Sequence, residues 1–233
     1  MKVRAILVTT ILTVTTTIIQ SPANASSFAG LNIRVRGNID GNFSSLPPYS
    51  DTINFFGTCL SDVVPNVNFD WGGGGPAYCP SDFFTTYFYG YIKSPVTGTV
   101  NFYEVADDGF YLEIGGQSVI SDWELQGFDN PNGSGSIALQ QNQVYPIRIW
   151  HYEYGGGAGV KLFWNTSKND FSSAVIVPNS ALATDSSYWG VTEICGYKGN
   201  SLNAKNAIGS AKSASPATSK SNGVGVCQNA ASR

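Results

Sequence analysis

The chain has 233 residues, of which only 12% are charged and 13% are aromatic, and its formal net charge at neutral pH is −3. This balance excludes a typical nucleic-acid-binding protein, because no cluster of Lys and Arg is present to neutralise phosphates. The 26 Gly residues, together with many Asn, Ser and Thr, indicate strands and turns rather than helices.

The beginning of the chain has the features of an export signal. Lys2 and Arg4 give a positive start, an apolar and Thr-rich run follows over residues 5–19, and the Ala-Asn-Ala at 23–25 has the small-x-small form that signal peptidase accepts. The run is too short and too diluted by Thr for a membrane-spanning helix, which needs ~20 mostly apolar residues. We expect residues 1–25 to be a signal peptide and the mature protein to be secreted or extracellular, with cell-surface association left open.

Residues 28–98 show little regular pattern apart from one aromatic strand. The run "FFTTYFYGYI" at 83–92 predicts that strand, and the Gly-rich "NFDWGGGGPAYCP" at 68–80 precedes it. The glycines lack the Gly-Lys-Ser/Thr ending and the following helix of a phosphate-binding loop, so we interpret the Gly-rich run as a flexible loop.

Four Cys fit an oxidising compartment, and three disulfide pairings are possible. We favour Cys59–Cys79 and Cys195–Cys227, because each pair lies within one loop-rich region. Each bond would close a loop of roughly 20 to 30 residues and stabilise the fold by about 3 kcal/mol in the chain-entropy description. A metal site built from Cys is disfavoured, because no two Cys are closely spaced and the chain has one His.

The clearest strand pattern lies in residues 99–164. Phe110, Leu112 and Ile114 alternate with less apolar residues, and Gly-Gly at 115–116 separates them from the run "QSVI", which predicts a β-hairpin. Further alternations run through residues 145–151 and 160–164. Several short strands separated by turn residues predict an all-β fold, an antiparallel β-sandwich or barrel.

Residues 198–226 are rich in Ser, Ala, Asn, Gly and Lys and contain almost no aromatic residues. Such a low-complexity segment cannot bury a core. We therefore expect one β-sandwich domain at 26–197 and a low-complexity tail at 198–233, with Cys227 tying the end of the tail back to the domain.

Asp107 and Asp108, followed by Gly109, form the one place where two acids are adjacent. Calcium takes six to eight oxygen ligands, and carboxylates are prominent among them. Adjacent carboxylates on an extended trans chain point to opposite faces, so binding one ion together requires an unusual backbone such as a cis peptide. A simple Asp-Asp-Gly turn between two strands is the alternative, and the local sequence alone favours it.

Two longer stretches change that balance. "GTVNFYEVADDGFYLEIGGQSVISDW" at 98–123 contains Asp-Asp-Gly, an apolar strand with a hydrophobic-x-Ile-x-Gly ending, and Trp123. "YPIRIWHYEYGGGAGVKLFW" at 145–164 contains a Tyr-Pro strand, a Gly/Ala loop and a Leu-x-Trp ending. In this order and separation they resemble the protective-antigen (PA-fourteen) domain family, which includes yeast flocculins, bacterial adhesin modules and inserts in glycosidases. The resemblance covers residues 80–185.

The resemblance implies a β-sandwich in which, in lectin members, two neighbouring loops hold a calcium ion that binds sugar hydroxyls directly. The paired acids of the first loop, often joined by a cis peptide, correspond to Asp107 and Asp108. The second loop is residues 151–159 in this chain. Its single acid, Glu153, is the expected side-chain ligand, and the carbonyls of Gly155 and Gly157 are the expected backbone ligands.

Sugar recognition also needs apolar surface, because aromatic rings stack on the apolar face of a sugar. Trp123, Tyr152 and Tyr154 lie near the two loops in sequence, although such residues more often pack on a strand face. The expected carbohydrate-binding residues are Asp107, Asp108, Tyr154 and Trp123.

An enzyme is disfavoured. The single His, His151, alternates with strand residues and is more simply a packed side chain, and no Gly-x-Ser-x-Gly is present. Outside the metal candidate, nothing positions the opposed carboxylates of a glycosidase. We expect a secreted, lectin- or adhesin-like module that binds carbohydrate through calcium, without nucleic acid or membrane insertion. The alternative is a structural or protein-interaction module with no sugar site, because fold does not fix function.

Overall fold

The structure is a computed structural model that describes residues 28–37, 57–129 and 131–190, and the backbone of 193–196 and 226–229. The predicted signal peptide and most of the predicted tail therefore lie outside the described residues. Within the described ranges, regular structure consists of strands and three short 3-10 turns, η1 (Phe171–Ser173), η2 (Asn179–Ala181) and η3 (Ser186–Trp189). No helix in these ranges has the length and apolar character needed to cross a membrane.

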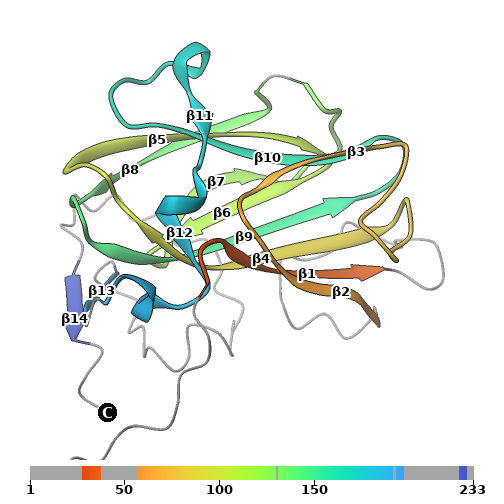
Figure 1. Cartoon of the computed structure of the whole chain (residues 1–233). Coiled ribbons are helices and arrows are strands. Elements are labelled where there is room, and N and C mark those ends of the chain that lie inside the picture. Colours follow the sequence, from red (N-terminus) through yellow and green to blue (C-terminus); the bar gives the residue numbers. More distant parts are fainter. Residues whose placement is uncertain (1–27, 38–56, 130, 191–192, 197–225, 230–233) are drawn as a thin grey trace, which may run out of the picture.

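Two antiparallel sheets face each other, which confirms the predicted β-sandwich (Figure 1). The larger sheet has the order β2 (Gly57–Val64), β1 (Leu31–Gly37), β4 (Phe84–Lys93), β9 (Val144–Glu153), β6 (Phe110–Ile114), β7 (Gln117–Asp122), with β12 (Leu182–Ala183) paired to β4. The smaller sheet has the order β11 (Val175–Ile176), β10 (Ala158–Asn165), β5 (Gly98–Asp107), β8 (Gly133–Leu139), with β3 (Asn68–Gly72) paired to β10.

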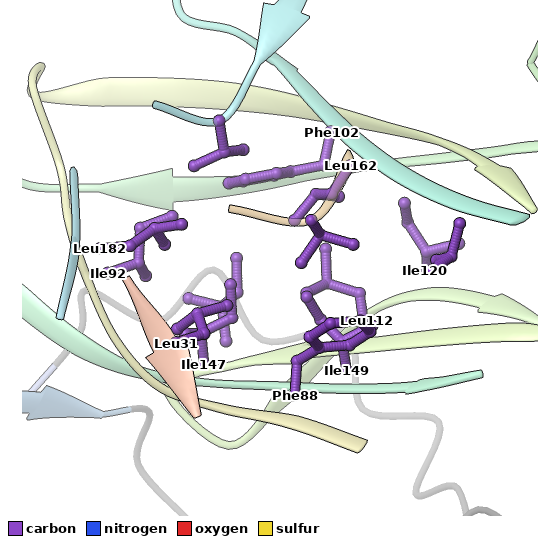
Figure 2. Close-up of a cluster of buried hydrophobic side chains, with 14 of the residues drawn as sticks. Leu31, Phe88, Ile92, Phe102, Leu112, Ile120, Ile147, Ile149, Leu162 and Leu182 are labelled. Carbon is purple, nitrogen blue, oxygen red and sulfur yellow. The ribbon is translucent and has the colours of Figure 1, made fainter. Parts of the chain in front are cut away.

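The core lies between the sheets and follows from the alternation in the sequence. Phe110, Leu112 and Ile114 of β6 are fully buried, whereas the residues between them remain partly exposed. Figure 2 shows Leu112 and its neighbours of the larger sheet opposite Phe102 and Leu162 of the smaller sheet. Each fully buried side chain of this size contributes roughly 1.5–3 kcal/mol. The sandwich is therefore held together by apolar burial.

The predicted hairpin is confirmed at β6 and β7. Gly115 and Gly116 have φ angles of 61° and 81°, the left-handed values that a two-residue hairpin turn of the primed type requires. The turn pairs Ile114 with Gln117, and the register then shifts by one residue between Leu112 and Glu113, so that Phe110 lies opposite Asp122.

Residues 28–98 contain more regular structure than their pattern suggests. The aromatic run forms β4, as predicted, and β1 shows a strict alternation in which Leu31, Ile33 and Val35 are buried. The other two strands, β2 and β3, are edge strands whose side chains are mostly exposed or half-buried. Strands that bury so little leave no apolar period in the sequence.

The predicted disulfide between Cys59 and Cys79 is present, with a Cα–Cα distance of 5.3 Å. It joins β2 to the segment between β3 and β4. Strands β13 (Glu193–Gly196) and β14 (Val226–Asn229) pair antiparallel, and their backbone register sets Cys195 opposite Cys227. The side chains of that second pair lie outside the described part of the chain, so the second disulfide stays a prediction.

Three connections meet at one end of the sandwich, on the right in Figure 1. Asp107, at the end of β5, is paired with Gly159 of β10. Glu153, at the end of β9, is paired with Phe84, where β4 begins. The turn after Asp107, the loop after Glu153 and the segment before Phe84 are therefore neighbours, although they are far apart in sequence.

Candidate metal centre

The structure brings three acidic residues together at this end. Each of Asp107, Asp108 and Glu153 offers a carboxylate oxygen, and these oxygens all lie within 4.8 Å of one another. Glu153 is 0% exposed and Asp108 is 5% exposed. The peptide bond between Asp107 and Asp108 is cis, as the family resemblance predicts.

Asp108 is fixed by backbone donors from both sides. Its Oδ2 accepts a hydrogen bond from the N–H of Tyr154 at 2.7 Å, and its Oδ1 accepts one from the N–H of Gln126 at 3.0 Å. The Gln126 side chain also donates to the carbonyl oxygen of Asp108 at 3.0 Å. Charge-assisted bonds of this kind are among the stronger ones in proteins. They hold the carboxylate in one orientation between two loops.

The main chain at Asp107 is held by His151. The Nε2 of His151 lies 2.9 Å from the carbonyl oxygen of Asp107, and because a carbonyl only accepts, this nitrogen carries the proton. His151 is fully buried, and burial lowers its pKa to about 4, so the ring is neutral. The prediction that His151 is a packed side chain is confirmed, and the ring also positions a residue of the acidic pair.

Two glycines let the loops approach closely. A Cβ at Gly109 would overlap the buried ring of Tyr152, which explains why glycine follows the two acids. A Cβ at Gly157 would lie 3.0 Å from the Oδ2 of Asp107. The Asp-Asp-Gly turn and the glycine loop therefore fit against each other because side chains are absent at these points.

Gathering three carboxyl groups in a buried place is electrostatically unfavourable. Burial, together with the charges of Asp108 and Asp107, raises the pKa of Glu153 to about 9. Burial and the charge of Asp108 raise the pKa of Asp107 to about 6. Neither carboxylate oxygen of Glu153 makes a well-formed hydrogen bond among the described residues, and the nearby backbone N–H of Gly155 only partly offsets the rise in its pKa. A buried acid without such a bond is costly to ionise unless a cation lies beside it.

The residues present fit a calcium ion. Carboxylate oxygens are hard ligands, and the buried Glu153, whose two oxygens make no well-formed hydrogen bond among the described residues, lies next to the Asp pair. With one oxygen from each acid, the three residues provide three of the six to eight oxygens that calcium takes, so second carboxylate oxygens, backbone carbonyls, water or ligand must supply the rest. Gly155 and Gly157 lie in the adjoining loop, and their part as carbonyl ligands stays a prediction.

The aromatic candidates divide into two kinds. Tyr152 is fully buried and packs edge-on against Trp123, with ring centroids 4.7 Å apart. Tyr154 is half-buried, and its ring meets that of Phe83 edge-on at 5.3 Å. Tyr152 is therefore a packing residue, whereas Trp123 and Tyr154 are half-buried.

Sequence reasoning did not find Gln126, Asp82 or Glu104. Gln126 holds Asp108, and Asp82 accepts a hydrogen bond from the loop after β9. Glu104 of β5 is 0% exposed, and burial together with the nearby Asp122 carboxyl raises its pKa to about 9. None of the three belongs to a recognisable motif.

The two antiparallel sheets define an all-β sandwich domain. The three convergent carboxyl groups at its loop end define a candidate metal site. The chain belongs to the PA14 domain family, which it matches over residues 39–175. It is 27% identical over 135 residues to the anti-sigma-I factor RsgI3 of Acetivibrio thermocellus, a match that covers 58% of this chain and 20% of that protein. The chain thus spans about a fifth of the length of this relative.

Two solved structures have the same fold. The PA14 domain of the MpAFP antifreeze protein aligns with a TM-score of 0.56 at 19% identity, covering 71% of this chain and 96% of that one. The PA14 sugar-binding domain from an RTX adhesin aligns with a TM-score of 0.55 at 18% identity, covering 68% and 99%. At this level of identity the likeness shows the fold.

Proposed function

We propose that this chain is a secreted carbohydrate-binding domain that holds calcium at Asp107, Asp108 and Glu153 and recognises sugar hydroxyls through the ion. The observation that carries the proposal is the convergence of the three carboxylate oxygens within 4.8 Å, with neither oxygen of Glu153 in a well-formed hydrogen bond among the described residues. A sugar-binding domain of the same family and fold, from an RTX adhesin, supports it. The disulfide supports an extracellular location.

The residues around the ion would have different roles. Tyr154 and Gln126 orient Asp108 through backbone donors, and His151 fixes the carbonyl of Asp107. When bound, calcium would supply coordination positions for neighbouring hydroxyls of a sugar ring. An added Cβ at Gly155 or Gly156 would meet no atom within 4 Å, so the loop leaves room for a ligand above it.

Apolar contact would come from two aromatic rings. Tyr154, whose N–H holds Asp108, and Trp123, which packs on Tyr152, are half-buried, and we propose that they stack on the apolar face of a sugar. We propose binding rather than catalysis. The single His donates from Nε2 to a carbonyl and is fully buried, so it is not placed to act as a general base on a bound ligand.

The test is thermal unfolding of the mature protein with calcium and with chelator, followed by a glycan array under both conditions. An ion that binds only the folded state stabilises it by about 2.7 kcal/mol at a hundredfold excess over Kd. We expect a clear rise in Tm with calcium and glycan binding that chelator abolishes. An unchanged Tm would remove the calcium site, and glycan binding that persists in chelator would remove calcium-mediated recognition.

A second candidate function is a structural or protein-interaction module with no sugar site. A relative that is named as an anti-sigma-I factor and not as a sugar-binding protein, RsgI3, supports it. A broad glycan array that stays silent while calcium still raises Tm would support this second function.

A further inference from the structure

The segment 73–83 begins and ends beside the loop 154–157. Gly72 of β3 is paired with Ala158, where β10 begins, and Phe84 of β4 is paired with Glu153, where β9 ends. These two strand pairs therefore place the two ends of segment 73–83 next to the two ends of loop 154–157. The segment lies against the loop that carries the candidate ligands.

Two contacts join them. The Oδ1 of Asp82 accepts a hydrogen bond from the N–H of Gly156 at 3.1 Å, across 74 residues of sequence. The ring of Phe83 meets the ring of Tyr154 edge-on at 5.3 Å. Gly156 has a φ of 111°, which residues with side chains rarely adopt, so the loop tip is held in a conformation that suits this bond.

The segment is itself anchored. Cys79 is joined by the disulfide to Cys59 of β2, and Gly75 lies so close to the carbonyl of Pro80 that no side chain fits there. Phe83, next to Asp82, has a φ of 55° although it is not glycine. Backbone in this region persists where the surrounding contacts enforce it. The carboxylate of Asp82 is therefore presented from a tightly constrained segment.

Asp82 also adds to the electrostatics of the site. Its negative charge is one of the causes that raise the pKa of Glu153, after burial and the charges of Asp108 and Asp107. Asp82 thus acts on the acidic group through its charge, although it does not belong to the triad within 4.8 Å.

We propose that segment 73–83 is a third loop of the candidate site and that Asp82 is its positioning residue, which holds the tip of the 154–157 loop through Gly156. The proposal rests on the proposed function for what that loop binds, and on the hydrogen bond for how the loop is held. In its calcium-bound form, the site is then framed by three loops, one of which is tied to the larger sheet by a disulfide.

The first test is hydrogen exchange in chelator, which needs no ion. Asp82→Ala removes the acceptor, and Asp82→Asn keeps an acceptor oxygen but removes the charge. Asp185→Ala is the matched control, because Asp185 also accepts a backbone N–H, from Ser187 at 2.8 Å, near the opposite end of β4. We expect amides of residues 154–157 to exchange about tenfold faster in Asp82→Ala, with Asp82→Asn and the control close to wild type. Unchanged exchange in Asp82→Ala would overturn the proposal.

The second test is a calcium titration of the same proteins. We expect about tenfold weaker calcium binding in Asp82→Ala and a smaller loss in Asp82→Asn, where only the charge is removed. If wild type binds no calcium while the exchange result holds, the proposed function fails and the positioning role stands. If wild type binds calcium while Asp82→Ala exchanges and binds as wild type does, the positioning role fails and the proposed function stands.

Discussion

The N–H of Tyr154 donates a hydrogen bond to the Oδ2 of Asp108 at 2.7 Å and so joins the two acidic loops. The Oδ1 of the same carboxylate accepts from the N–H of Gln126. Both oxygens of Asp108 are therefore engaged by backbone donors, whereas neither oxygen of Glu153 makes a well-formed hydrogen bond in the described part of the chain. Asp108 organises the loops as well as being a candidate ligand, and the two roles can be separated by substitution.

Asp108→Asn should abolish the calcium-dependent rise in Tm and also lower the stability of the ion-free protein. An Asn side chain has one acceptor oxygen, so its NH2 group must face a backbone N–H. An unsatisfied buried donor costs about 1–3 kcal/mol. Urea unfolding in chelator measures this loss, and far-ultraviolet dichroism should show that the sandwich is kept, because Phe110, Leu112 and Ile114 bury without the ion.

The matched variant is Asp107→Asn. The nearby backbone N–H of Phe128 lowers the pKa of the Asp107 carboxyl, whereas two backbone donors hold that of Asp108, so an Asn amide disturbs fewer bonds at position 107. This variant should lose the calcium response with a smaller loss of ion-free stability than Asp108→Asn. Equal losses of ion-free stability in the two variants would show that the two backbone hydrogen bonds to Asp108 do not give it a larger part in the stability of the fold.

Without calcium, the protein should become less stable as pH rises above neutrality. Burial is the first cause that raises the pKa of Glu104 and of Glu153 to about 9. The unfolded chain releases these protons near its ordinary pKa of about 4.5, so the linked stability is full below that value and is lost as pH rises toward about 9. His151 has the opposite effect. Because burial lowers its pKa to about 4, the stability linked to its neutral form is lost as pH falls below about 6.5.

The measurement is urea unfolding in chelator at about pH 6.5 and about pH 8.5, a window set by these values. Glu104→Gln should reduce the loss of stability between the two, because a neutral amide replaces an acid that must otherwise ionise. Glu124→Gln, at an exposed position, is the control and should keep the wild-type dependence. A Glu104→Gln protein with the full dependence would show that Glu104 does not titrate in this range.

Tyr154→Ala should weaken glycan binding by about 1–2 kcal/mol if its ring stacks on sugar. The backbone N–H that holds Asp108 is kept in this variant, so its calcium response should remain. Trp123→Ala should lower stability as well, because the Trp123 ring packs on buried Tyr152. A glycan array, or a titration with a glycan that the wild type binds, measures the loss of affinity. A melting curve of each variant measures the loss of stability. Unchanged affinity in both would remove the aromatic contacts from the site.

Cys195 should form a disulfide with Cys227. The pairing of Cys59 with Cys79 leaves these two Cys for each other, and β13 and β14 set them opposite one another in register. Peptide mapping without reductant should recover one cross-linked peptide containing both residues. Recovery of both as free thiols would be the contrary result.

Sequence reasoning predicted the strands within residues 99–164 and the aromatic strand β4, but it missed β1, although alternate residues of β1 are buried. In β6 alternate residues enter the core, so the hairpin of β6 and β7 follows from its period of two. Strands β9 and β10 are buried along most of their length, so the period of two in their sequences does not mark one exposed face. The edge strands β2 and β3 have no such period, because they are mostly exposed and are specified by their pairing partners.

The same distinction holds for the site. Asp107 and Asp108 could be found because adjacent acids before a glycine are visible in one sequence, and Glu153 because it is the only acid of its loop. Gln126 and Asp82 could not, since Gln126 holds the Asp108 carboxylate through its own backbone N–H, 18 residues away, and Asp82 accepts from the backbone N–H of Gly156, 74 residues away. A hydrogen bond to a main-chain N–H requires no particular side chain at the other end, so it leaves no complementary residue type in the sequence.

The three glycines after Tyr154 differ in what they would tolerate, and this difference indicates where a new specificity could be engineered. Gly156 has a φ of 111°, and a Cβ at Gly157 would crowd the Oδ2 of Asp107 at 3.0 Å. At Gly155 the φ lies outside the left-handed range and an added Cβ would meet no atom within 4 Å. A library of side chains at position 155 would therefore sample new contacts beside the acids while the framework that holds Asp108 stays unchanged.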